Sequence, residues 1–281
     1  GIITTLFILI TLLVYVLHPK LQNFQSKLLA CFLFSLSMGS LTLSIIALPN
    51  VVFPHFICGV IGYLGYFFLL VSYCWLNVIS FNMLRQLQKS IDHLSDKKRF
   101  ILYAGYAMGI PLLMVLLLII LEHSNISISF KSGIGGDYCW FSPLNWSALI
   151  YWFGIDAILL CLDVSFYLVV ILSLKALLKS QPDSKEYLQQ LKFAYRYGTL
   201  VLVMAISCLI DATANIKSVH QSSDEHSWFY LSSFVSAIQG FVIFLIFGLG
   251  PLRQWRHQRF CRRIGYVRDD VQASNFENIE I

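Results

Sequence analysis

The residues of this chain most able to do chemistry are acidic and amide side chains inside apolar segments. Asp156 and Asp163 lie seven residues apart in one segment, and Asp211 lies in another. A seven-residue spacing places two side chains on one face of a helix. The amide side chains in comparable positions are Asn77, Asn82 and Gln239. We expect these groups to line a bundle interior, because an ionisable side chain at mid-bilayer costs about 3 kcal/mol.

Interior groups of this kind can form a ligand site, a polar network that shifts between two states, or hydrogen bonds that only hold helices together. Catalytic uses fit the sequence poorly. An aspartyl intramembrane protease needs two opposed carboxylates, but Ile155 stands where such proteases carry a glycine before the aspartate. All seven histidines lie at segment ends or in loops, where they cannot build a buried zinc site. The sequence therefore predicts no enzyme, no metal and no cofactor.

Seven apolar segments must position these groups. Their approximate ranges are 1–17, 28–48, 56–82, 100–121, 147–174, 194–215 and 227–250. Charged residues make up only 12% of the chain, against about 25% in soluble domains. We therefore predict an all-α membrane protein, with a seven-transmembrane helix bundle over residues 1–250. A short amphipathic inner helix over 251–266 and a disordered cytoplasmic tail over 267–281 are predicted to follow.

The basic residues predict the orientation of this bundle. All of the 20 Lys and Arg residues except Lys131 and Lys217 fall on alternate flanks of the segments. Loops kept in the cytosol retain positive charge, so the N-terminus is expected outside and the C-terminus inside. The net charge of +5 then suits anionic membrane lipids as partners, and it is no sign of nucleic-acid binding.

The third inner flank contains Pro182, which interrupts a helix. Asp183 and Glu186 follow with the three-residue spacing of a capping box. Leu188, Leu191 and Tyr195 then continue at helical spacing. This pattern predicts that the sixth helix begins well inside the cytosol, and the alternative is a short amphipathic helix confined to the loop.

Two of the seven cysteines, Cys58 and Cys139, lie toward the outer face. The outer compartment is oxidising, so they can form a disulfide, although two free thiols remain the alternative. Cys261 stands among basic residues after the last segment, where it is either palmitoylated or an unmodified thiol.

Several motifs resemble a known family. Gln239-Gly240-Phe241 in the last segment is similar to the Gln-Gly-Phe signature of secretin-like and adhesion-type G-protein-coupled receptors, and Cys139-Trp140 resembles their outer-loop Cys-Trp pair. Within that family B group, the likeness is greatest to insect Methuselah-like receptors. The stretches that carry it are residues 19–23, 75–81 and 204–211. The family's proline in span six is absent, and Gly198 is the candidate hinge there.

The resemblance implies a multi-pass receptor of the plasma membrane. It would pass a signal from an unknown extracellular ligand, with a peptide or protein favoured, to a heterotrimeric G protein. It also implies that Cys139 bonds to Cys58 at the top of span three. The chain begins at Gly1 rather than Met, so any ectodomain is missing from it. A seven-span transporter or channel-like protein, or a non-coupling orphan scaffold, remains the alternative.

The same hypothesis gives roles to particular residues. The expected ligand vestibule comprises Trp140, Asp156 and Asp211, and the expected polar network of the bundle comprises Asn77, Asp163, Gln239 and Gly240. The expected G-protein face comprises Arg85, Lys97, Lys98, Lys175, Lys192 and Arg196. Positive charge retained by topology alone is the alternative explanation for that face.

Overall fold

A computed structural model of the chain describes residues 2–17, 23–48, 53–87, 95–124, 131–136, 138–142, 146–181, 184–219 and 225–249. The longer helices are α1 (Ile2–Leu17), α2 (Phe24–Ile46), α3 (His55–Leu87), α4 (Asp96–His123), α5 (Gly154–Ser180), α6 (Lys185–Val219) and α7 (Glu225–Ile243). Five-residue π-helical segments, η3 (Leu149–Phe153) and η4 (Phe244–Gly248), precede α5 and follow α7. Within the described ranges every regular element is a helix. The predicted inner helix and tail, Cys261 included, lie outside them.

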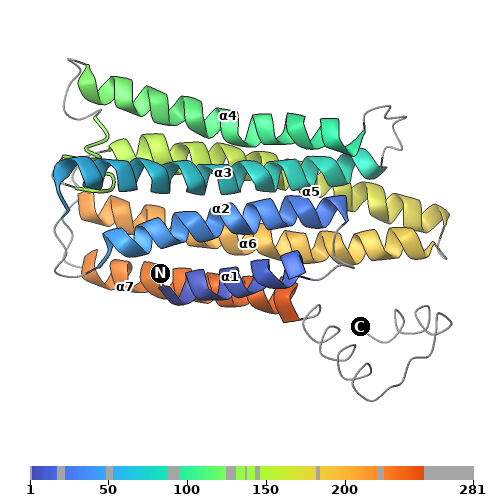
Figure 1. Ribbon diagram of the computed structural model, residues 1–281. Helices are drawn as coiled ribbons and strands as arrows, with labels where there is room; N and C mark the ends of the chain where they lie inside the picture. The colour runs from blue at the N-terminus through green and yellow to red at the C-terminus, as the bar shows by residue number, and fades with distance from the viewer. Residues whose placement is uncertain are drawn as a thin grey trace, which may run out of the picture.

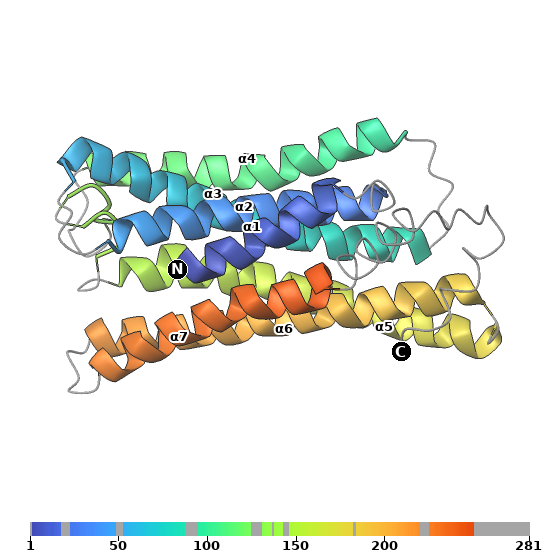
Figure 2. The ribbon, with the colours of Figure 1, turned by 60° about the horizontal axis from the view of Figure 1, so that its bottom comes forward.

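The helices run side by side, and consecutive helices point in opposite directions (Figure 1). α1 packs against both α2 and α7, so the two ends of the described chain lie next to each other. α3 contacts α2, α4 and α5, and it is therefore the central helix of the bundle. Figure 2 shows α4 on the outside of this arrangement, farthest from α6 and α7.

Five of these helices are long and apolar enough to cross a bilayer: α2, α3, α4, η3 with α5, and α6. Ile2–Leu17 and Phe234–Gly248 are shorter apolar stretches. Apolar side chains cover much of the outer surface of α4, including Ile101, Leu113 and Ile120, each more than 60% exposed. Such a surface is suited to lipid and would be unfavourable in water.

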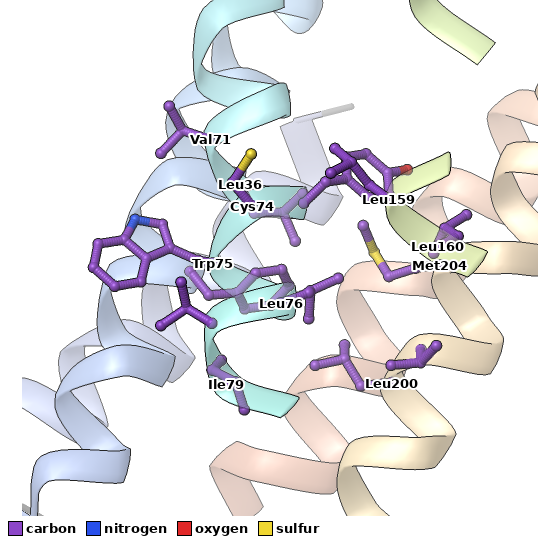
Figure 3. Close-up of a cluster of buried hydrophobic side chains, with 14 of the residues drawn as sticks. Leu36, Val71, Cys74, Trp75, Leu76, Ile79, Leu159, Leu160, Leu200 and Met204 are labelled. Carbon is purple, nitrogen blue, oxygen red and sulfur yellow. The ribbon is translucent and has the colours of Figure 1, made fainter. Parts of the chain in front are cut away.

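The core forms where α3 meets α2, α5 and α6. Figure 3 shows side chains from these helices converging, with Cys74, Leu76 and Ile79 of α3 between Leu36 of α2 and Leu159 of α5. Leu200 and Met204 of α6 close the cluster. Residues 69–80 of α3 are all buried. α3 thus has no lipid-facing side over this length, and its polar side chains can only meet other helices.

α6 is one continuous helix from Lys185 to Val219, as the spacing of its apolar residues predicts. At its start the Tyr187 amide lies 3.5 Å from Oγ of Ser184, the residue directly before the helix. Asp183 itself lies outside the described residues. α5 and α6 extend beyond the other helices at the right-hand end of Figure 1.

Candidate functional site

Asp163 of α5 lies at a polar contact of three helices. Its side chain is 0% exposed. Oδ1 accepts hydrogen bonds from Ser80 Oγ at 2.8 Å and Tyr197 OH at 3.0 Å, and Oδ2 accepts one from Asn77 Nδ2 at 3.2 Å. We call Asn77, Ser80, Asp163 and Tyr197 the central junction. It ties α3 to α5 and α6 in the middle of the bundle, where no water would compete for these bonds.

The central junction also holds backbone groups. Tyr197 OH lies 2.8 Å from the Leu76 carbonyl of α3, and Asn77 Nδ2 lies 3.2 Å from the Leu159 carbonyl of α5. Tyr197 has one hydroxyl hydrogen to serve both Leu76 and Asp163. A movement of α6 away from both α3 and α5 would therefore break both contacts of this one hydroxyl group.

A second acidic centre lies nearer the end that carries the disulfide. Asp156, about two helical turns before Asp163, is also 0% exposed, and neither of its carboxylate oxygens has a hydrogen-bond partner among the described residues. Asp211 of α6 lies within electrostatic range of Asp156 and accepts a hydrogen bond of 2.5 Å from Ser232 Oγ of α7. We call Asp156 and Asp211 the outer carboxylate pair.

The loop between α4 and α5 is held against the start of α3. The predicted disulfide joins Cys58 to Cys139, with the Cα atoms 4.6 Å apart. Gly62, one turn further along α3, lies under the loop: a Cβ added there would stand 2.1 Å from the Cys139 carbonyl oxygen. Gly59 and Gly65 flank it at three-residue spacing, and we call the three the glycine seam. Gly59 and Gly62 allow the loop backbone to approach α3 closely. Gly65 makes room for Thr42 of α2 and the Trp140 ring.

The start of the same loop is fixed to α4. Glu122 Oε2 accepts hydrogen bonds from Ser132 Oγ at 2.9 Å and from the Gly133 amide at 3.2 Å. Lys131 Nζ donates to the Glu122 carbonyl at 3.0 Å. Gly133 and Gly135 adopt φ values of 72° and 83°, which glycine adopts without steric cost. The loop is therefore attached at both of its described ends.

Trp140, which the sequence predicts to line the ligand vestibule, is half-buried and belongs to an aromatic cluster. Its ring centroid lies 5.7 Å from that of Trp152 in η3. Trp152 in turn contacts Tyr66 and Tyr73 of α3 edge to face, at 5.9 and 6.2 Å. Both tyrosines lie within electrostatic range of Asp156. The aromatic cluster thus extends from the loop to the outer carboxylate pair.

The structure places Gln239 and Gly240 away from the central junction. Gln239 Nε2 points to Met204 Sδ of α6. Gly240 lies against α1, where an added Cβ would be 2.7 Å from the Thr4 carbonyl oxygen. Thr4 Oγ1 also donates to the Ser236 carbonyl at 2.8 Å. The Gln-Gly pair therefore lies in the packing of α7 against α6 and α1.

The predicted G-protein face gathers at one end of the bundle. Arg85 is half-buried at the end of α3, and Lys97 and Lys98 are exposed at the start of α4. Lys175 near the end of α5, and Lys192 and Arg196 near the start of α6, are exposed. These helix ends all lie at the right of Figure 1, opposite the disulfide.

Sequence reasoning missed four residues of these sites. Ser80 and Tyr197 complete the central junction, Ser232 binds Asp211, and Ser207 Oγ is buried without a partner among the described residues. Hydroxyl side chains are common in apolar helices, where they often bond to their own backbone. The glycine seam had a visible signal, since Gly59, Gly62 and Gly65 recur every three residues.

Comparison with known proteins gives a consistent answer. The family model for the 7 transmembrane receptor (Secretin family) matches residues 1–243. The chain is 32% identical to the G-protein coupled receptor Mth2 of Drosophila simulans over 255 residues, which cover 86% of this chain and 47% of that protein. It is 31% identical to the probable G-protein coupled receptor Mth-like 10 of Drosophila melanogaster over 267 residues, covering 86% and 44%.

The chain spans about half the length of these curated relatives. The G-protein coupled receptor Mth of Drosophila melanogaster is 26% identical over 250 residues. The resemblance to Methuselah-like receptors is confirmed, and the family is one of receptors rather than enzymes. Its apolar helices are those of a multi-pass plasma-membrane protein. The match covers most of the chain, so the chain belongs to the secretin family of seven-transmembrane receptors.

Proposed function

We propose that this protein is a G-protein-coupled receptor that passes an extracellular signal to a heterotrimeric G protein. In this proposal α1 to α7 each cross the plasma membrane, with the N-terminus outside and the C-terminus in the cytosol. The observation that carries the proposal is the separation of two ends of the bundle. One end has the disulfide and the described part of the loop between α4 and α5, and the other has the exposed basic residues of α4, α5 and α6.

The proposed signal runs through the bundle along its polar contacts. An extracellular ligand, for which we favour a peptide or protein, would meet the loop and Trp140. It can shift the receptor only as far as its affinities for two bundle states differ. Lengthening the Tyr197 contacts to Asp163 and Leu76 would free the basic end of α6 from α3. A cleft bordered by Lys175, Lys192 and Arg196 would then be open to the G protein.

The coupling can be tested in cells that express the full-length protein. We expect basal dissociation of at least one type of heterotrimer, measured by energy transfer between its labelled subunits. Lys192→Glu combined with Arg196→Glu should lower this signal about tenfold, which corresponds to about 1.4 kcal/mol. The matched control is Lys217→Glu, a charge reversal at the opposite end of the same helix. An equal loss in the control, or flux of an ion or solute without any G-protein response, would argue against the proposal.

The orientation is tested separately with epitope tags in intact cells. A tag at the C-terminus should bind antibody only after permeabilisation, because the basic flanks are retained in the cytosol. A tag inserted after Lys131 should bind antibody without permeabilisation of the cells. Labelling of both tags in intact cells would contradict the proposed orientation even if signalling were observed.

A further inference from the structure

The structure points to a binding site that the receptor function does not itself require: we propose that Asp156 and Asp211 bind a small monovalent cation between α3, α5, α6 and α7. The chemistry could be supplied by a free alkali-metal ion or by the primary ammonium group of a ligand. This inference does not depend on G-protein coupling. Cation binding can be measured through binding and unfolding alone, so a negative result would not contradict the proposed receptor function.

The first argument is the unpartnered state of Asp156. The side chain is 0% exposed, and both oxygens lack a hydrogen-bond partner in the described parts of the chain. Protonation would remove the charge but would still leave a donor that needs an acceptor of its own, and none lies within hydrogen-bond distance in the described chain. Buried carboxylates are otherwise paired with a cation or bound to a metal. A positively charged group between the two carboxylates would satisfy these oxygens.

The second argument is that the described chain offers no positive charge for this pair. No Lys, Arg or His lies in the described stretches of α5, α6 and α7 that surround it, apart from those near the helix ends. Lys217, the nearest in sequence to Asp211, lies six residues away and so on a different face of α6. Lys131 donates to the Glu122 carbonyl instead. The cation must therefore come from outside these segments.

The third argument is the set of neighbouring groups. Ser207, one turn below Asp211 on the same face of α6, has a buried hydroxyl oxygen without a partner in the described residues. Tyr66 and Tyr73 lie within electrostatic range of Asp156, and the face of an aromatic ring also attracts cations. Carboxylate and hydroxyl oxygens are ligands for hard cations. The described residues contain no group of three His, Cys, Asp or Glu side chains that could hold a metal ion, which favours a single charge over a divalent ion.

The position favours a cation from the extracellular side. Asp211 lies eight residues before the outer end of α6, about 12 Å along the helix axis. The complete burial of Asp156 restricts the site to a small group. Na⁺ and methylammonium are therefore suitable probes, and N-methylglucamine, which is too large to enter, is the matched reference cation.

The test is thermal unfolding of the purified full-length protein in lipid nanodiscs at constant ionic strength. Replacing N-methylglucamine chloride by NaCl or methylammonium chloride should raise the Tm by about 2–4 °C in a saturable manner. A response to Na⁺ alone identifies a free ion, and a stronger response to methylammonium identifies a subsite for a ligand's ammonium group. An unchanged Tm with both probes, or a response to Ca²⁺ alone, would overturn the proposal.

Variants connect the response to the site. Asp156→Asn should abolish the response, because it removes the negative charge that binds the cation while keeping the shape of the side chain. Ser207→Ala should keep the fold and shift the half-saturating concentration upward by about threefold or more. Asp96→Asn, at an exposed carboxyl on α4, is the control and should respond as the unmodified protein does. A full response in Asp156→Asn, or no shift in Ser207→Ala, would contradict the assignment.

Discussion

Tyr197 is the residue whose contacts bear most directly on movement of α6. It is fully buried, and its hydroxyl lies within hydrogen-bond distance of both Leu76 O and Asp163 Oδ1. Removing the hydroxyl would take away the one hydrogen that Leu76 O and Asp163 Oδ1 share, in a dry environment, which costs about 1–3 kcal/mol. Because these contacts hold α6 against α3, their loss should favour states in which the basic end of α6 is free.

Tyr197→Phe is therefore expected to lower the Tm and to raise basal signalling in the same protein. Thermal unfolding in detergent and basal G-protein dissociation in cells measure the two effects. Tyr195→Phe, which removes an exposed hydroxyl two residues away, should change neither. A lower Tm without a change in basal signalling would mean that the central junction contributes to stability alone.

The disulfide between Cys58 and Cys139 gives a second prediction at the scale of residues. Cys58→Ser should destabilise the protein by about 2–5 kcal/mol. The disulfide joins residues 81 positions apart, and without it the unfolded chain gains conformational entropy. The double variant Cys58→Ser/Cys139→Ser should be no less stable than either single variant, since one bond is lost in each case. Cys161→Ser, at an exposed free cysteine, is the control. Unfolding temperatures with and without a reducing agent provide the measurement.

At the scale of elements, the packing of the loop on α3 depends on the glycine seam. A Cβ on Gly62 would lie 2.1 Å from the Cys139 carbonyl and 2.7 Å from Ile134, so the loop must move away. Gly62→Ala should therefore cost about 1–3 kcal/mol despite the better helix propensity of alanine. Gly105→Ala is the matched control in α4: nothing lies within 4 Å of its added Cβ, so stability should be unchanged or slightly higher.

Thermal unfolding separates these two variants, and the accessibility of the loop to a protease gives a second readout. Faster cleavage of the loop in Gly62→Ala than in Gly105→Ala would place the effect in the loop. Equal stability of the two variants would show that the loop backbone does not require the glycine seam.

Gly198 shows what sequence reasoning could not settle about an element. The absence of a proline in span six made it the candidate hinge, but α6 continues through it without interruption. A Cβ there would be 2.3 Å from Tyr167 OH of α5, so the glycine allows a close contact between the two helices. A glycine in a helix can serve either close packing or flexibility. Only the position of the neighbouring helix shows which of the two reasons applies.

At the scale of the whole molecule, the sequence predicted the helices well because apolar runs and charged flanks have strong, local signals. It also identified Asp163 and Asn77 as interior groups, since a polar side chain in an apolar run has to face other helices. The partners within the central junction were not predictable. They depend on how each helix is rotated about its axis, which also places Gln239 beside Met204 and Gly240 beside Thr4.

The covalent attachment of the loop to the central helix has a geometric consequence. α3 is 33 residues long, about 50 Å, and it is fixed to the loop at one end only. If it tilts as a rigid rod about Cys58, each degree moves Arg85, about 40 Å away, by about 0.7 Å, so a tilt of a few degrees displaces Arg85 by about the width of an atom. In the proposed receptor the same leverage works in reverse, because coupling between two sites is reciprocal: a G protein bound at the basic end would change the affinity of the loop end for the proposed ligand.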